Sequence, residues 1–349
     1  MNAREISLGI AIVLQFGIGV SQNGFLFLFY TLTFASGHKF SSADAILAHL
    51  ALANTMVLLA LGVPETLSAW GRRNFLDDVG CKILVYLYRV ARGLAICTTC
   101  LLSVFQAVTL SPGTSRWARI KARLPGYVFP SCLLSWALSL LLDFDTLLYV
   151  KGPGNNDSAR LLLDLKYCTE VIAETTLVIS ILVSLRDVFF VGLMSVASGY
   201  VVFVLHGHHR RVRRLRAPGR SPGATPEVRA AKRVVALAAL YVLLYGRQTI
   251  TMSVLVNLSE KSPLLVNGHL VFSLTFSAVS PFLMIHSDRR IGTFWKRGSA
   301  ASHVDPSRRS GEAACLPNVS PSRKRGPDVP IWVMPSVYSW GWVTIQLPL

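Results

Sequence analysis

The stretch CKILVYLYRVARGLAICTTCLLSVFQAVTL, residues Cys81–Leu110, decides the fold. It is apolar over nearly its whole length, and its only charged residues, Lys82, Arg89 and Arg92, lie in its first half. A helix needs about 20 predominantly apolar residues to cross the ~30 Å hydrocarbon core of a bilayer. Because lipid offers the backbone no hydrogen-bond partner, such a segment must be a helix rather than an open strand. The stretch therefore predicts a transmembrane helix.

Six other stretches have the same character, some of them with a polar interruption. They are Ile6–Phe34, Ala43–Leu67, Gly126–Leu148, Val178–His206, Val234–Val256 and Val266–His286. The whole 349-residue chain is 52% hydrophobic and 15% charged, with a mean hydropathy of +0.47. Soluble domains contain about 25% charged residues, so this composition excludes an ordinary soluble globule. We predict an all-α membrane protein, a bundle of seven transmembrane helices.

The net charge of +17, from 35 Lys and Arg against 18 Asp and Glu, is concentrated between alternate spans. The connectors Ala35–Ser42, Ser111–Pro125 and Gly207–Arg233 hold 1, 4 and 9 basic residues, and the segment after His286 holds nine more. Cytoplasmic loops of membrane proteins carry such an excess. We therefore predict an outside N-terminus, an inside C-terminus and a multi-pass protein of the plasma membrane. Since these residues adjoin the spans, we predict contact with anionic lipid and not with nucleic acid.

Two of the six cysteines, Cys81 and Cys168, fall on the predicted outer side, where the compartment is oxidising. A disulfide between them would tie the long outer loop to the span that begins at Cys81; the alternative is two unpaired thiols. The same loop carries the sequon Asn156-Asp157-Ser158. Its predicted position outside the membrane leads us to expect glycosylation of Asn156.

Charged side chains inside a span are costly, and they usually face the bundle interior or a cavity. Four residues of the quoted stretch have the spacing i, i+3, i+4 and i+7, which puts them on one helix face: Val85, Tyr88, Arg89 and Arg92. This face predicts a ligand pocket in the outer half of the bundle, and Arg247 is predicted to join it. Gln248 and Tyr245, beside Arg247 in the sixth span, are further candidates for the pocket. The alternative is a structural network in which the arginines pair with acids; the candidates are Glu65, Glu174 and Asp187.

Other polar residues have simpler interpretations. Asn54, inside the second span, is predicted to hydrogen-bond a neighbouring helix. His206, His208 and His209 suggest a metal cluster, but adjacent arginines repel a cation and no carboxylate accompanies them, so we predict no metal site. The chain lacks the G-x-S-x-G, H-E-x-x-H and G-x-x-x-x-G-K-[ST] motifs. We therefore predict neither an enzyme nor a cofactor.

The last part of the chain differs from the rest. DRRIGTFWKR, Asp288–Arg297, separates apolar from basic residues and suits a short interfacial helix after the last span. From residue 298 the sequence turns rich in Ser, Arg and Pro, a composition typical of disorder. We predict a membrane domain over residues 1–297 and a disordered cytoplasmic tail over residues 298–349.

Four longer strings resemble vomeronasal type 1 receptors, a family of G-protein-coupled receptors. They are HLALANTMVLLALGVPETLSAWG (His49–Gly71), FLDDVGCKILVYLYRVARGLAICTTCLLSVFQAVTLSP (Phe75–Pro112), LRDVFFVGLMSVASGY (Leu185–Tyr200) and SPFLMIHSD (Ser280–Asp288). The resemblance extends over roughly Leu8–Lys296. Phe105-Gln106-Ala107 stands where most rhodopsin-like receptors have Asp-Arg-Tyr, which agrees with this family.

The resemblance implies a receptor for a small-molecule chemosignal, such as a pheromone, that activates a heterotrimeric G protein of the Gi/Go type. We expect its pocket between the third, fifth, sixth and seventh spans, near Tyr88, Arg89, Arg92 and Arg247. The residues expected to face the G protein are Gln106, Arg116, Arg119, Arg210, Arg211, Arg213 and Arg214.

Besides an orphan structural membrane protein and the product of a decayed receptor gene, two alternatives remain at this point. A bitter taste receptor is also a seven-helix chemosensory protein without Asp-Arg-Tyr, but the long third-span string disfavours it. A small-molecule transporter or channel belongs to a different class. The odd number of spans and the absence of an internal repeat disfavour that class.

Overall fold

The computed structural model describes residues 3–36, 41–72, 75–111, 115–152, 161–165, 167–171, 174–215, 226–257, 263–288 and 290–292. All of them belong to one compact unit, Met1–Arg297. The predicted tail, residues 298–349, and the sequon at Asn156 lie outside the described residues. Of the predicted interfacial helix after the last span, only residues 288 and 290–292 are described.

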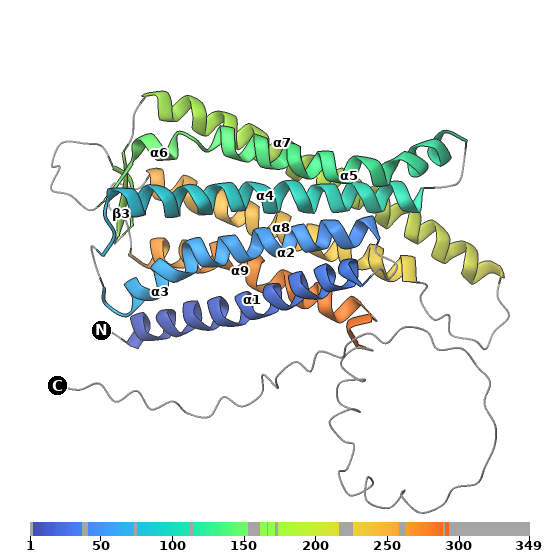
Figure 1. Cartoon of the computed structure of the whole chain (residues 1–349), viewed down its shortest axis with the longest axis horizontal. Coiled ribbons are helices and arrows are strands. Elements are labelled where there is room, and N and C mark those ends of the chain that lie inside the picture. The colour runs from blue at the N-terminus through green and yellow to red at the C-terminus, as the bar shows by residue number, and fades with distance from the viewer. Residues whose placement is uncertain are drawn as a thin grey trace, which may run out of the picture. The chain divides into compact units, whose positions relative to one another are not determined.

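Helices carry all seven predicted spans (Figure 1). They are α1 (Ala3–Ala35), α2 (Ser42–Val57), α3 (Val63–Ala69), α4 (Asp78–Leu110), α5 (Ser115–Leu142), α6 (Thr146–Tyr149), α7 (Glu174–Leu215), α8 (Pro226–Asn257) and α9 (Pro263–Ser287). A π-helical segment, Leu58–Gly62, joins α2 to α3 just before Pro64. Proline cannot donate the backbone hydrogen bond of a regular helix, and the wider turn precedes it.

Among the described residues, five helices are long and apolar enough to cross a membrane. They are Ile6–Ala35, Ser42–Ala69, Asp78–Leu110, Trp117–Tyr149 and Val178–Gly207, and Val271–His286 is a shorter apolar helix. The prediction of a helical membrane protein is confirmed. The sixth and seventh predicted spans are helical in α8 and α9, and the total of seven membrane crossings stays a prediction.

The structure departs from the predicted elements in two places. The connectors predicted to lie inside are shorter than expected, because α5 already begins at Ser115, α7 continues to Leu215 and α8 begins at Pro226. The long loop before α7, which is predicted to lie outside, is not purely irregular: it contains a small antiparallel sheet of β1 (Val150–Lys151), β2 (Leu161–Leu165) and β3 (Cys168–Val171), in the order β1-β3-β2. Strands this short carry too weak a sequence pattern to be predicted.

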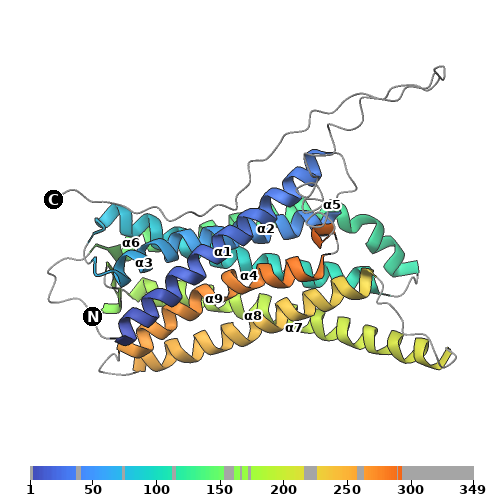
Figure 2. The same cartoon turned by 90° about the horizontal axis from the view of Figure 1, so that it is seen from below.

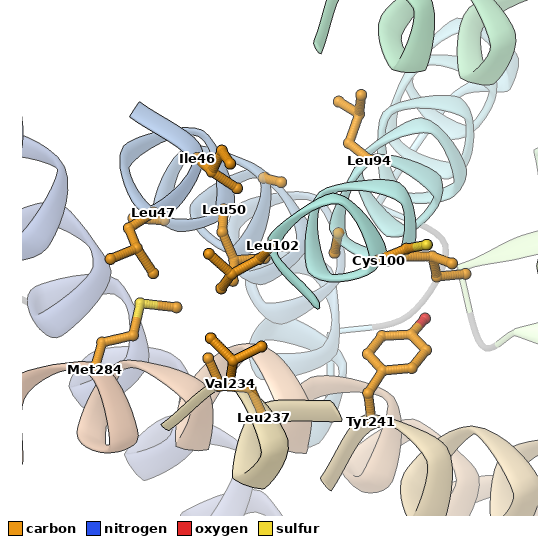
Figure 3. Close-up of a cluster of buried hydrophobic side chains, with 14 of the residues drawn as sticks. Ile46, Leu47, Leu50, Leu94, Cys100, Leu102, Val234, Leu237, Tyr241 and Met284 are labelled. Atoms are coloured by element: carbon orange, nitrogen blue, oxygen red, sulfur yellow. The ribbon is translucent and has the colours of Figure 1, made fainter. Parts of the chain in front are cut away.

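Helix α4 is the centre of the bundle, since it packs against α2, α5, α7 and α8. Helix α1 contacts α2 and α9, and α8 lies between α9 and α7 (Figure 2). Most side chains of the main core come from α2, α4, α8 and α9, and Leu47, Leu102, Val234 and Met284 converge there (Figure 3). By contrast, α1, α5 and α7 expose many large apolar side chains, such as Phe203. Exposed apolar faces on peripheral helices fit a lipid environment.

Buried amides link the helices around α9. Asn54 donates to Ser280 Oγ at 2.9 Å and accepts from Ser277 Oγ at 3.2 Å. Asn23 of α1 donates to the Ser277 backbone oxygen at 2.8 Å. The prediction that Asn54 bonds a neighbouring helix is confirmed.

An ion-pair clamp joins the start of α2 to the residues after α9. Arg290 reaches Asp44 through two hydrogen bonds, Nη2 to Oδ1 at 2.6 Å and Nη1 to Oδ2 at 3.0 Å, and also contacts Asp288. Asp44 accepts from the Ser41 backbone N–H as part of a capping box. The hydrogen bonds with Asp44 hold the pKa of Arg290 above its usual value, against the opposing effect of burial. The Asp44 carboxylate therefore caps α2 and also holds the residues after α9 against the start of α2.

Because Asp44 has both roles, we expect Asp44→Ala to lower the free energy of unfolding by about 2–3 kcal/mol. The measurement is chemical unfolding of the purified chain in lipid nanodiscs. Asp77→Ala is the matched control, since Asp77 is exposed and caps α4 through a single bond from the Gly80 N–H. The control is expected to cost only about 1 kcal/mol. Equal losses in the two variants would show that the clamp contributes nothing.

Candidate functional site

A cavity opens in the half of the bundle nearer the start of α4. It holds about 420 Å³ of empty space, its open mouth included. Its walls come from four helices: Val57 of α2; Tyr88, Arg92 and Ala95 of α4; Tyr241, Leu244, Tyr245 and Gln248 of α8; Phe272, Ser273, Phe276 and Ser277 of α9. Ligand pockets have mostly apolar walls with a few polar groups among them. The cavity fits that description.

The residues predicted to line one pocket are placed in different surroundings. Tyr88 and Arg92 line the cavity. Val85 instead packs against the cluster around Cys81 and Cys168. Arg89 turns toward α6, where Nη1 donates to Thr146 Oγ1 at 3.2 Å and lies 3.8 Å from Asp145 Oδ2. Residues at i, i+3, i+4 and i+7 lie on the same side of a helix. That side of α4 is wide enough for its residues to contact different elements.

Arg247 is exposed, and its guanidinium lies over the ring of Phe272, with Cζ 3.1 Å from the ring centre. It is outside the cavity lining, where Gln248 stands instead. Helix α7 also differs from expectation, because no described residue of α7 lines the cavity and Val57 of α2 does. The contribution of α7 is indirect and runs through Asp187.

A chain of buried ion pairs connects the cavity wall to α7. Arg92 Nη2 donates to Asp187 Oδ2 at 2.6 Å, and the other carboxylate oxygen of Asp187 accepts from Arg186 Nε at 3.0 Å and lies 2.9 Å from its Nη2. Arg186 Nη1 in turn donates to Asp143 Oδ2 at 3.1 Å. Arg186, Asp187 and Asp143 are 7%, 1% and 1% exposed. The predicted alternative, an arginine of α4 paired with Asp187, is therefore confirmed.

Gly93 gives this network its space. A Cβ at this position would lie 2.7 Å from Ser139 Oγ and 3.0 Å from Arg186 Nη1. Any larger residue would have to move the Ser139 hydroxyl and would press on the Arg186 guanidinium. The absent side chain thus lets α4, α5 and α7 meet around Arg186.

The outer loop is fastened at two neighbouring residues. Cys81 and Cys168 form a disulfide, with their Cα atoms 5.7 Å apart, so this prediction is confirmed. Next to it, the Tyr167 hydroxyl donates to Glu65 Oε1 at 2.6 Å. Burial, together with the Glu65 carboxylate, raises the pKa of Tyr167 well above its usual value. The phenol therefore stays protonated and remains a donor to Glu65, an acid that the sequence had suggested as a partner for an arginine.

The residues predicted to face a G protein lie toward the opposite end of α4. Gln106 is 7% exposed and is thus covered in this structure. Arg119 of α5 and Arg210 of α7 are exposed. The side chains of Arg116, Arg211, Arg213 and Arg214 lie outside the described residues. Nearby, Ser111 Oγ and the Tyr200 hydroxyl are 3.1 Å apart and hold the end of α4 to α7.

The sequence missed much of the site. Tyr241, Phe272 and Phe276 form much of the aromatic wall, but they lie in apolar stretches where an aromatic residue is normally a core residue. Tyr245 and Gln248, which the sequence suggested as pocket candidates beside Arg247, do line the cavity. Tyr241 points from α8 toward α4 (Figure 3). Asp143 was also missed, because it stands near the end of a predicted span, where an acid needs no special explanation. Asp143 could have been found only by asking which acids inside the predicted spans are needed to pair with the arginines there.

Comparison with known proteins matches this chain to one receptor family. Residues 6–297 match the model of the vomeronasal organ pheromone receptor family. Human vomeronasal type-1 receptor 4 is 36% identical over 304 residues, which cover 85% of this chain and 100% of that protein. This chain belongs to the vomeronasal type 1 receptor family. The zebrafish (Danio rerio) olfactory receptor class A-like protein 1 is 35% identical over 286 residues, 81% of this chain and 90% of its own.

Membership in the vomeronasal type 1 receptor family fixes the class of function. The relatives are chemosensory G-protein-coupled receptors and not enzymes, so the family implies a small-molecule ligand and coupling to a G protein. The matched residues include α4, the cavity and the disulfide. The resemblance inferred from the four strings is confirmed.

Proposed function

We propose that this chain is a plasma-membrane chemoreceptor that crosses the bilayer seven times, with its N-terminus and the disulfide-fastened loop outside. The N-terminal end of α1 and the small sheet lie at the same end of the bundle, which supports this orientation (Figure 1). The excess of Lys and Arg in the opposite connectors supports it too. Asn156, in the outer loop, is the proposed glycosylation site.

The observation that carries the function is the link from the cavity to α7. A chemosignal bound beside Arg92 changes the surroundings of the Arg92–Asp187 pair, and Asp187 belongs to α7. A ligand shifts a conformational equilibrium only by its difference in affinity for the two states. A ligand that fits one placement of α7 better than the other would therefore move the inner end of that helix. Arg210 and its basic neighbours lie there.

A direct test measures coupling and topology together. The full-length chain, with an epitope at its N-terminus, is expressed with Gαi, Gαo, Gαs or Gαq, one at a time. The cells are exposed to a panel of volatile and steroidal compounds. We expect the epitope to be detected on intact cells and a response only with Gαi or Gαo. Responses confined to Gαs or Gαq would refute the Gi/Go assignment, and ligand-dependent currents without any G protein would refute the receptor function.

Arg119 offers a test of the inner surface. It is exposed on α5, so Arg119→Ala removes a charge without leaving a buried partner. We expect agonist-driven G-protein activation to fall about twofold to fivefold, the range of one exposed charge pair. Arg72→Ala is the control, because Arg72 is exposed at the opposite end of the bundle, and it should leave activation unchanged. Equal responses of the two variants at equal surface expression would exclude Arg119 from the G-protein contact.

A further inference from the structure

Arg92 has unused hydrogen-bonding capacity inside the cavity. A guanidinium carries five N–H donors, yet among the described atoms Arg92 makes a single hydrogen bond, from Nη2 to Asp187. Its Nε is buried without a partner, and 29% of its side chain stays exposed although it sits within the bundle. Since Arg92 lines the cavity, that exposed part faces the space where a ligand would lie. The site therefore offers donors to an acceptor atom.

The charge of Arg92 is already balanced. It pairs with Asp187, which pairs with Arg186, which pairs with Asp143, while Arg89 faces Asp145 separately. These pairs contain three cations and three carboxylates. The other residues of the cavity lining carry no charge. An anion bound at Arg92 would add a negative charge beside a pair that is already neutral, in a medium of low dielectric constant, which is unfavourable. Arg247, another cation near the lining, is exposed and lies over Phe272 outside the cavity.

The remaining walls suit a flat apolar body. Five of the lining residues are aromatic: Tyr88, Tyr241, Tyr245, Phe272 and Phe276. Ser273 and Ser277 also line the cavity, but their hydroxyls donate to the His269 backbone oxygen and to Asn54 Oδ1. The donors of these serines are thus occupied. Arg92, the Gln248 amide and the tyrosine hydroxyls are left as donors toward a ligand, and Arg92 is the charged one among them.

We propose that the cavity selects an uncharged, ring-bearing molecule with a hydrogen-bond acceptor, such as a ketone, ester or lactone, and discriminates against carboxylates. This refines the proposed function, since it rests on the cavity being the ligand site. It also revises the simplest interpretation of an intramembrane arginine, that of a receptor for an acid. Asp187 sets the specificity, because it supplies the countercharge that a carboxylate ligand would otherwise provide.

The test uses direct binding, so it does not depend on a G protein. The full-length chain in lipid nanodiscs is heated in the presence of compound sets that share one ring skeleton and differ in a single group: a methyl ketone, a hydrocarbon, a carboxylate or a primary amine. One such set is 4-phenylbutan-2-one, butylbenzene, 3-phenylpropanoate and 3-phenylpropylamine, and further sets carry cyclohexyl and bicyclic rings. A bound compound raises the melting temperature in a concentration-dependent way.

We expect ketones to bind at least tenfold more tightly than the matched carboxylates, hydrocarbons and amines. Arg92→Met should reduce ketone binding to the level of the hydrocarbon. Asp187→Asn leaves Arg92 without its countercharge, so carboxylates should gain affinity relative to ketones. If Asp187→Asn fails to reach the membrane, the ranking on the wild-type chain still decides.

Carboxylates that bind as well as ketones, ketones that bind no better than hydrocarbons, or a complete lack of binding across the sets would overturn this specificity. Phe282→Leu, an exposed position on α9 outside the cavity lining, is the control variant and should bind as the wild type does. Ketone binding without activation of any G protein would refute the proposed coupling and leave the specificity intact. Activation by carboxylates alone would refute the proposed specificity and leave the proposed coupling intact.

Discussion

Arg186→Met is expected to lower the free energy of unfolding by about 3–5 kcal/mol, the cost of breaking a buried ion pair from one side. Arg186 is 7% exposed and lies between two carboxylates, Asp143 and Asp187. Asp187 keeps Arg92 as a partner, whereas Asp143 loses the cation that the structure gives it. The measurement is unfolding of the purified chain in nanodiscs, together with its surface expression in cells.

Arg210→Met makes the same substitution on the same helix, α7, at an exposed position, and should change stability by less than about 0.5 kcal/mol. The charge argument has its own check. Adding Asp143→Asn to Arg186→Met removes the stranded carboxylate, so the double variant should be more stable than Arg186→Met alone. A double variant that is no better would mean that packing around Gly93 and Ser139, and not charge, is what Arg186 supplies.

The arginine pairs show how far the sequence reaches. Hydropathy and charge placement predicted the helices and the polar half of α4 near its start, because a bilayer penalises every unpaired polar group and so leaves a strong pattern in the residues. The disulfide followed from the position of two cysteines on one predicted side. Each of these inferences needs only the knowledge of which segment a residue belongs to. Segments several helical turns long can be predicted reliably from sequence.

Which way a side chain points is a different kind of question. Arg89 and Arg92 are three residues apart on one helix, yet one faces Thr146 and the other faces the cavity. The outcome depends on the rotation of α4 relative to its neighbours and on two acids, Asp145 facing Arg89 and Asp187 facing Arg92. Similarly, Arg247 and Gln248 are adjacent in the sequence, and only Gln248 lines the cavity. A helical period predicts a face about a third of a turn wide, which is too coarse to separate such neighbours.

Removing the disulfide is the second large change. A crosslink that closes 87 residues restricts the unfolded chain by about 4–5 kcal/mol in the chain-entropy estimate. Membrane helices that persist after unfolding already restrict that chain, so we expect the double variant Cys81→Ser with Cys168→Ser to lose about 2–4 kcal/mol. Thermal unfolding in nanodiscs measures the loss. Cys132→Ser, at a half-buried free cysteine of α5, is the control and should unfold nearly as the wild type does.

The hydrogen bond from Tyr167 to Glu65 is the second restraint on this loop, and it tests whether the two restraints act together. Tyr167 is adjacent to Cys168, so the disulfide already holds the phenol near its acceptor. Tyr167→Phe should therefore cost about 1–3 kcal/mol in the intact chain, as for a buried bond to a charged group. It should cost clearly less once the disulfide is gone, because the freed loop must first be ordered before the hydrogen bond can form. Two neighbouring restraints on one segment are coupled, and a double-mutant cycle measures that coupling. If the two losses simply add, the loop is held independently at each point, and the disulfide does not position Tyr167.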